Sequence, residues 1–347
     1  MSRAIAGRPP VRLRGVLVAS SLALVVASVV ALIVGSKLFG LDDLVALIGG
    51  EASSLQQTIF YELRLPRVLL ALGVGATLAA TGAIFQALLK NPLAEPYILG
   101  VSNGCAVGAI IGLNLPFIST TLASSFLAGQ FGISLLSFIG GAIVVGLVLR
   151  IGRRTRGTES ESMLLGGVMV AAIGAAIIFL MLAILPNVRG AIEWMLGDLG
   201  SATPTIGLIA LGLFGLLLLA SFLIGSPLNL VALGREQAAS LGLNVDRTTI
   251  IAYLGSSLVV GLAVSFCGAI GFVGLVVPHI IRQLVGPDHR LLMPLVVVNG
   301  ALFLLLCDTL ARTALPILGL GTAELPVGAV TALVGAPLFV HLLTRGK

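Results

Sequence analysis

Charged side chains are scarce in this sequence, and their scarcity excludes a soluble protein. Asp, Glu, Lys and Arg make up 10% of the 347 residues, whereas 58% are hydrophobic and the mean hydropathy is +1.14. A water-soluble fold could not cover its surface with so few polar groups. The apolar residues form long runs instead of alternating with polar ones, which excludes the strands of a membrane barrel. The sequence therefore predicts an all-α integral membrane protein.

Side chains that bind metals or form covalent cross-links are also few. The three cysteines lie in apolar stretches without zinc-type spacing, which favours small core residues over disulfides; they are Cys105, Cys267 and Cys307. No ligand-like neighbour accompanies any of the three histidines, which are His279, His289 and His341. We therefore expect no metal and no cofactor.

Motifs for ATP hydrolysis and for bond cleavage are absent from the chain. It has no G-x-x-x-x-G-K-[ST] loop, no H-E-x-x-H and no pair of carboxylates inside an apolar run. We expect that the protein is not an enzyme, and the missing catalytic pair argues against an intramembrane enzyme in particular. Energy for any transport must come from a partner or from an ion gradient.

Basic residues are dispersed over short loops, so the net charge of +6 reports membrane topology and not a nucleic-acid surface. We expect ten spans, at about residues 15–36, 68–89, 97–113, 126–149, 162–185, 205–225, 248–266, 270–286, 291–312 and 325–344. Fifteen of the twenty Lys and Arg residues then lie on one side, and the positive-inside rule makes that side cytoplasmic. Both termini are cytoplasmic in this topology, and residues 1–347 form a single transmembrane domain.

Three stretches have to be assigned individually. Residues 15–36 could be a signal peptide, but this run is too long for one and lacks a cleavage site. The uncharged run 96–149 must cross twice, with a turn at 114–116 and the Ser/Thr cluster that follows. The uncharged run 248–281 could be one tilted helix or two short helices. Arginines that look cytoplasmic flank it on both sides, which favours a hairpin that turns near residues 267–270.

A polar interruption, SPLNLVALGREQAASLGLNVDR at residues 226–247, separates two long apolar runs. Its apolar residues recur at helical spacing opposite a polar face; they are Leu230, Leu233, Ala238 and Leu241. The pattern predicts a short amphipathic helix with corners at Gly234 and Gly242. Such a helix outside the bilayer suits the docking of a soluble partner. A linker with accidental helical periodicity is the alternative.

Five ordered motifs resemble those of one family. They are RLPR at 64–67, NPLAEP with LGVSNG at 91–104, LGREQAASLG at 233–242, GAIGFVGLVVPHIIR at 268–282 and ELPVGAVTALVGAP at 324–337. Together they resemble the FecCD family, the ten-helix permease subunits of ABC importers for iron-siderophores, haem and vitamin B12. The resemblance runs from about residue 15 to the end and is greatest to the vitamin B12 permeases. The motifs belong to the shared framework, so they do not fix the substrate or its path.

The resemblance implies a type II ABC importer fold in a bacterial cytoplasmic (inner) membrane. It implies a homodimer in contact with lipid, two cytoplasmic ATPase subunits and a periplasmic or lipid-anchored binding protein. Residues 227–247 would then be the coupling helices, with six positions in the ATPase groove: Leu233, Gly234, Arg235, Ala238, Leu241 and Gly242. Three arginines would meet acidic residues of the binding protein: Arg64, Arg67 and Arg312.

The charged residues near the membrane also allow other interpretations. Asp308 is the only acid inside a span, as expected of the coupling site in an ion-gradient-driven secondary transporter, our alternative function. Arg312 follows it by four residues, so the two could instead form an intrahelical pair. Arg64 and Arg67 could extend toward the aqueous side from a helix start without binding any partner.

Overall fold

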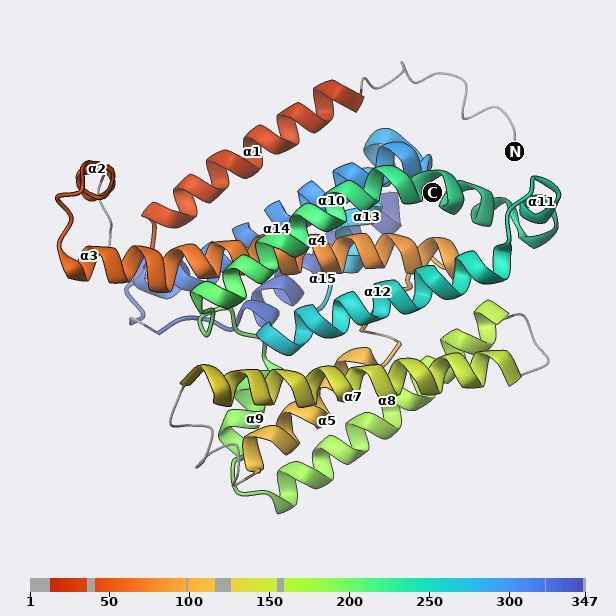
Figure 1. Cartoon of the computed structure of the whole chain (residues 1–347), viewed down its shortest axis with the longest axis horizontal. Coiled ribbons are helices and arrows are strands. Elements are labelled where there is room, and N and C mark those ends of the chain that lie inside the picture. Colours follow the sequence, from red (N-terminus) through yellow and green to blue (C-terminus); the bar gives the residue numbers. More distant parts are fainter. Residues whose placement is uncertain are drawn as a thin grey trace.

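The computed structural model describes residues 13–35, 41–97, 99–115, 126–154, 159–321 and 323–345, and every regular element in these ranges is a helix (Figure 1). The first half contains α1 (Leu13–Ile33), α2 (Leu41–Gly49), α3 (Ser54–Thr58), the π-helical turn η1 (Ile59–Arg64), α4 (Leu65–Leu88), α5 (Val101–Asn114), α7 (Phe126–Arg154) and α8 (Glu159–Ile184). The second half contains α9 (Val188–Met195), α10 (Pro204–Leu233), α11 (Arg235–Ser240), α12 (Val245–Cys267), α13 (Val273–Val285), α14 (His289–Ile317) and α15 (Val327–Arg345).

Many of these helices are suited to a bilayer. Seven described segments are long and apolar enough to cross one: Gly15–Ile33, Ser54–Leu88, Phe131–Gly152, Ser162–Ile184, Pro204–Leu233, Val245–Cys267 and His289–Ile317. Three shorter apolar helices accompany them: Val101–Asn114, Val273–Val285 and Val327–Leu342. The expected all-α membrane class is confirmed, whereas the count of ten crossings and the cytoplasmic termini stay predictions.

Several helix ends differ from the expected spans. Residues 227–233, expected in the polar segment 227–247, continue α10, because Pro227 removes only one backbone donor and does not end the helix. α5 begins at Val101 and not at residue 97, because turns precede it and Gly100 has a positive φ of 78°. The expected hairpin turn lies at residues 268–272, between α12 and α13. α5 ends at Asn114, and most of the turn expected after it lies outside the described residues.

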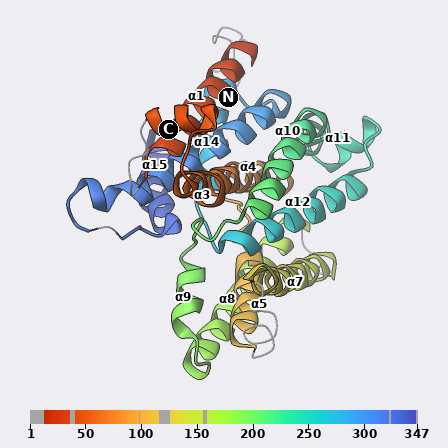
Figure 2. The ribbon, with the colours of Figure 1, turned by 60° about the vertical axis from the view of Figure 1, so that its left-hand side comes forward.

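Helix α4 forms the centre of the fold and is buried along almost its whole length. It packs most extensively against α10 and α14, and also against α13 and α12 (Figure 2). Glycines permit the close approach of these helices, since a Cβ at Gly82 would collide with the Gly274 carbonyl and one at Gly75 with the Gly300 carbonyl. The position of α4 is therefore fixed by contacts with helices encoded more than a hundred residues later.

A second layer, formed by α5, α7 and α8, lies beside this central group, and α12 lies between the two (Figure 1). Two glycines of α5 face α7: Gly104 meets Gly140, and Gly108 meets Leu136, in both cases backbone against backbone. Small residues thus allow this pair of helices to approach as closely as the central ones.

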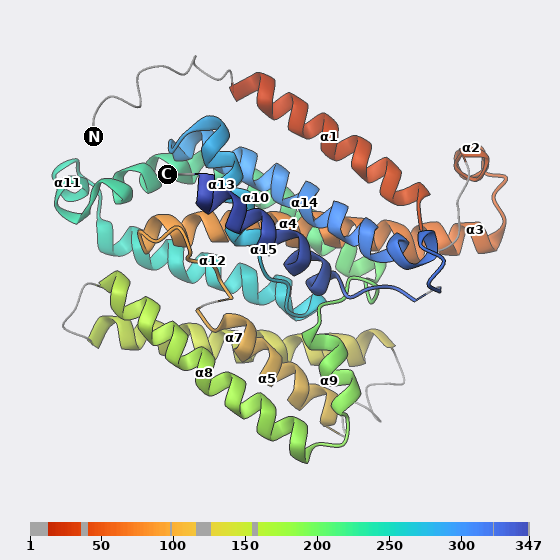
Figure 3. The ribbon, with the colours of Figure 1, turned by 180° about the vertical axis from the view of Figure 1, so that it is seen from behind.

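The molecule has two ends of different character. Helix α11 projects at one end, toward which the first residues of α1 and the last residues of α15 are also directed (Figures 1 and 3). Helices α2, α3 and α9 lie at the opposite end. The two groups of residues considered below occupy these two ends.

Candidate functional site

The projecting turn is formed by the end of α10, by α11 and by the start of α12. Gly234 and Gly242 have φ values of 116° and 86°, so both predicted corners are confirmed. The Asn244 side chain accepts a hydrogen bond of 3.0 Å from the backbone N–H of Arg247 and so caps α12. The chain forms a helix–corner–helix turn here because a glycine with positive φ lies at each point where the chain changes direction.

The surface of this turn is partly apolar. Leu233 and Leu241 are 57% and 62% exposed, whereas Ala238 is fully buried. Arg235 forms an exposed ion pair of 2.7 Å with Asp246. Of the six residues predicted to contact an ATPase, Ala238 can therefore act only by shaping the turn. The two leucines present apolar side chains within a polar surface, which is typical of protein–protein contacts.

Hydrogen bonds tie the end of α10 to the start of α14. Asn229 donates to an Asp288 carboxylate oxygen at 2.6 Å and accepts from the His289 backbone N–H at 2.8 Å. Asp288 also caps α14 by accepting from the Arg290 N–H at 3.0 Å. Burial alone would raise the pKa of Asp288, but hydrogen bonds from Arg290 and Asn229 hold it below its usual range. These contacts hold the end of α10 against the start of α14.

At the opposite end, a buried carboxylate lies between two arginines. The Arg67 Nε donates to Asp308 Oδ1 at 2.9 Å, and the Arg312 Nε lies 3.1 Å from Asp308 Oδ2. The predicted intrahelical pair of Asp308 and Arg312 is confirmed, but the partner from α4 was not predicted. Arg67 Nη1 also donates to Glu324 Oε2 at 2.6 Å. Asp308 is completely buried, whereas the Glu324 side chain is 37% exposed.

Arginine side chains also bind the end of α1. Arg64 Nη1 donates to the carbonyls of Leu32 and Ile33 at 2.6 and 2.7 Å, and Arg312 Nη2 donates to the Ala31 carbonyl at 3.3 Å. These carbonyls terminate a helix, where they lack intrahelical donors and carry partial negative charge. Arg64 is 7% exposed and thus does not extend freely into water.

The three arginines predicted to contact a binding protein all line one hollow of about 740 Å³. Its lining residues are Gly35, Leu55, Ile59, Leu63, Arg64, Arg67, Asp198, Gly200, Arg312 and Glu324. Sequence reasoning missed both of its acids, Asp198 and Glu324. No spacing could have revealed them, because Glu324 pairs with a residue 257 positions away.

The connection between α4 and α5 contains a buried acid. Glu95 is 9% exposed and accepts a hydrogen bond from the backbone N–H of Phe272, at the start of α13. Burial raises the pKa of Glu95 to about 7, although this hydrogen bond lowers it. Glu95 belongs to the NPLAEP motif quoted for the family resemblance, and sequence reasoning did not single it out.

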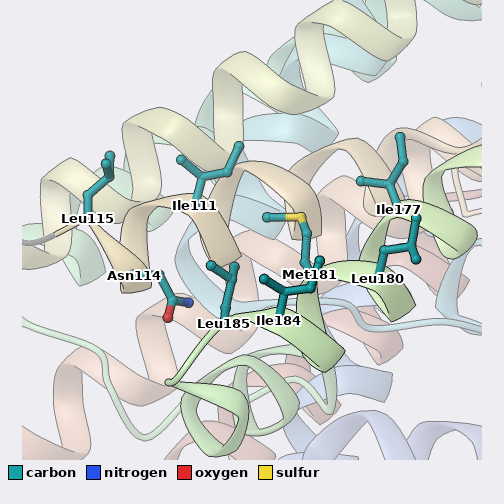
Figure 4. Close-up of a pocket in the computed structure, with 8 residues that line it drawn as sticks. All are labelled: Ile111, Asn114, Leu115, Ile177, Leu180, Met181, Ile184 and Leu185. Carbon is teal, nitrogen blue, oxygen red and sulfur yellow. The ribbon is translucent and has the colours of Figure 1, made fainter.

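An apolar hollow of about 340 Å³ lies between the ends of α5 and α8 (Figure 4). Asn114 is the one polar residue among those that line it. Its amide donates to the Ile110 carbonyl at 2.9 Å, and its oxygen accepts from the Asn187 N–H at 3.0 Å. The remaining side chains offer no polar group, so this hollow lacks the means to orient a charged ligand.

Metal-binding residues do not converge within the described ranges. No group of three or more His, Cys, Asp or Glu side chains there could hold a metal ion. The three cysteines are buried and unbridged. His279 lies 3.1 Å from the Gln283 amide and packs on Phe339, and His289 contacts Asn229.

Comparison with known proteins identifies the family of this chain. The model of the FecCD transport family matches residues 23–345. The chain belongs to the FecCD family. This FecCD protein is 38% identical over 296 residues to the cobalamin import system permease protein BtuC of Halobacterium salinarum, covering 83% of this chain and 73% of that one. It is 37% identical over 290 residues to the hemin transport system permease protein HmuU of Yersinia pestis, covering 83% and 84%.

The fold of this FecCD protein agrees with its family. A solved inward-facing structure of a metal-chelate type ABC transporter matches with a TM-score of 0.77 at 29% identity, covering 96% of this chain and 99% of the other. The resemblance inferred from the five motifs is thus confirmed. The protein is a multi-pass membrane permease of the ABC-importer type, and its relatives are transport subunits and not enzymes. Such permeases associate with ATPase and binding-protein partners.

Proposed function

We propose that this FecCD permease moves a metal chelate, namely cobalamin, haem or a ferric siderophore, into the cytoplasm across the inner membrane of a bacterium. It acts as a homodimer, and ATP hydrolysis in two separate subunits drives it. The observation that carries the proposal is the placement of two chemically different features, the projecting turn at α11 and the arginine-lined hollow, at opposite ends of the molecule. The named relatives transport cobalamin and hemin, which supports this class of substrate.

The projecting turn is proposed to be the contact with the ATPase. Its exposed leucines, Leu233 and Leu241, would enter an apolar groove, and the ion pair of Arg235 would hold the turn in shape. Gly234 and Gly242 would keep the corners narrow enough for docking. Because Asn229 binds the start of α14, ATP-driven movement of α11 would shift α14 as well. This end would then be cytoplasmic, together with both termini.

The arginine hollow is proposed to receive the binding protein at the opposite, external end. Arg64, Arg67 and Arg312 converge there, so acidic side chains of a partner would have to enter a recess rather than meet exposed arginines. Charge pairs of this kind set orientation and association rate more than affinity. Selection among metal chelates would belong to the binding protein.

Reconstitution tests the proposal directly. The permease with its ATPase should be placed in proteoliposomes with the cognate binding protein, which is first titrated with cobalamin, haemin and ferric siderophores. Uptake of the chelate that binds should require ATP and should persist when an ionophore collapses the proton gradient. Uptake that follows the gradient and ignores ATP would favour the secondary transporter.

The docking role has its own test. Arg64→Glu/Arg67→Glu should weaken binding of the cognate binding protein without preventing membrane insertion. Because Arg67 also pairs with the buried Asp308, affinity is measured only on variant protein whose folding has been checked by its melting temperature. Arg189→Glu is a matched control, because Arg189 is an exposed arginine on α9 at the same end but outside the hollow. Equal affinities for the double variant and the wild type would contradict the role.

The burial of Asp308 favours the ATP-driven mechanism over the alternative. An acid that carries a coupling ion must exchange protons or cations with water during the cycle. Asp308 has no exposed side-chain surface and lies between two arginines. These contacts are those of a structural charge.

A further inference from the structure

The two carboxylates on Arg67 differ in their freedom to leave it. Asp308 is fully buried and contacts both Arg67 Nε and Nη2 at 2.9 Å. Glu324 contacts the remaining nitrogen, Nη1, at 2.6 Å, and more than a third of its side chain is exposed. Withdrawal of Glu324 into water would therefore sacrifice one partly solvated ion pair, whereas withdrawal of Asp308 would strand a buried charge.

The other acid that lines the hollow, Asp198, is held in place locally. Asp198 Oδ1 accepts a hydrogen bond of 2.7 Å from the Gly200 backbone N–H, and the Asp198 N–H donates to the Cys267 carbonyl at 2.8 Å. These contacts are formed within its own loop and with the end of α12. Glu324 is thus the acid whose position depends most on Arg67.

The arginines of the hollow already lie close to acidic side chains. Arg67 pairs with Asp308 and Glu324, and Arg312 pairs with Asp308. Asp198 also lines the hollow, and Asp43 acts electrostatically on Arg64. An incoming carboxylate therefore has to compete with acids of the permease itself. Arg67 Nη1, which such a carboxylate would bind, already donates to Glu324.

We propose that Glu324 is an internal competitor for the acidic side chain of the binding protein, an inference that rests on the proposed docking role of the hollow. Glu324 occupies Arg67 while the hollow is empty. A carboxylate of the docked partner displaces it and takes the same nitrogen. No covalent step is involved, and the net charge of the hollow is kept by exchange of one carboxylate for another.

Displacement of Glu324 would also affect the position of α15, the helix that follows it. Glu324 lies three residues before α15, and its neighbour Leu325 donates to the Ala311 carbonyl of α14 at 3.0 Å. At Gly328, α15 packs so closely on the Leu196 and Ala269 carbonyls that a Cβ there would collide with Leu196. Occupancy of the hollow is therefore linked by short contacts to α9 and to the break between α12 and α13 (Figure 3).

The test measures affinity of the cognate binding protein for the complete permease–ATPase complex in nanodiscs. Glu324→Gln removes the competing charge and keeps the side-chain shape, so binding should tighten roughly fivefold, the equivalent of one partly exposed ion pair. Glu193→Gln is the matched control, because Glu193 pairs with an exposed arginine at the same end and outside the hollow. Its affinity should equal that of the wild type.

A double variant shows whether the effect acts through Arg67. In an Arg67→Gln background, Glu324→Gln should no longer tighten binding, because the shared nitrogen is gone. If Glu324→Gln folds poorly, as judged by its melting temperature, Glu324→Asp serves instead, since its shorter side chain weakens the same contact. Tightening that persists without Arg67 would overturn the proposal.

The outcomes separate this inference from the docking proposal. Unchanged or weaker binding of Glu324→Gln, with docking still weakened by Arg64→Glu/Arg67→Glu, would refute the competition and leave docking intact. No effect of any of these variants would refute both. A gain seen only in nanodiscs of anionic lipid would assign the hollow to a lipid headgroup and overturn the proposal.

Discussion

Replacement of Asp308 by Asn should strongly destabilise the permease. The substitution keeps the volume of the side chain and removes its charge. Arg67 would then retain only Glu324 as an acidic partner, and Arg312 would retain no acid that it contacts as an ion pair in the described structure. Both guanidinium groups would remain almost completely buried.

The size of the effect follows from this burial. Removal of one partner from a buried ion pair costs about 3–5 kcal/mol, because the charge that remains has lost both its partner and its water. For 347 residues, with an entropy of unfolding of about 0.7 kcal/mol/K, that corresponds to a fall in melting temperature of about 4–7 °C. Glu324→Gln, which removes a partly exposed partner of the same arginine, should cost about 1 kcal/mol or less.

Thermal unfolding of the purified protein in one detergent provides the assay. The double variant Asp308→Asn/Arg312→Gln should recover part of the lost stability, since it removes one of the stranded charges. A melting temperature for Asp308→Asn equal to that of Glu324→Gln would refute the reasoning. So would normal stability combined with loss of transport, because that result would make Asp308 a coupling residue rather than a structural charge.

Three further outcomes are expected elsewhere in the chain. Gly82→Ala should cost about 1–3 kcal/mol, because its Cβ meets the rigid Gly274 carbonyl, while Gly212→Ala, with open space around it, should leave the melting temperature unchanged. The folded-state pKa of Glu95 is raised from 4.5 to about 7. The protonated side chain therefore contributes to the free energy of unfolding in full below about pH 4.5, and this contribution is lost as pH rises through 7. Glu95→Gln should weaken the pH dependence of the melting temperature between pH 4.5 and about 7. A pH dependence equal to that of the wild type would rule out Glu95 as its cause. Asn229→Leu should lower chelate uptake per ATP hydrolysed and preserve ATPase activity, whereas unaltered coupling would exclude the link from α10 to α14.

The class of fold could be predicted from hydropathy and short motifs, because a long apolar run can adopt few structures in water or in lipid. The corners at Gly234 and Gly242 were also predictable, since glycine is the residue that most readily takes a positive φ. The pairing of Asp308 with Arg312 followed from helical spacing alone.

Contacts between distant parts of the chain could not be predicted in the same way. Arg67 meets Asp308 and Glu324 across 241 and 257 residues, and nothing in a single sequence records that proximity. The burial of Glu95 was hidden for a related reason, because a polar turn between two spans is normally expected in water. The length of α10 was underestimated because the polar interruption after residue 225 was assigned to a separate segment, whereas the helix continues through Pro227 to Leu233.

The central position of α4 has a consequence for biosynthesis. This helix leaves the ribosome early, yet α10, α13 and α14, against which it packs, follow only after residue 203. Its glycines must therefore face lipid or other temporary neighbours until the last third of the chain has been inserted. Final assembly of the core is a late, post-insertional event, and a nascent chain stalled before Val273 would hold α4 without two of these three helices.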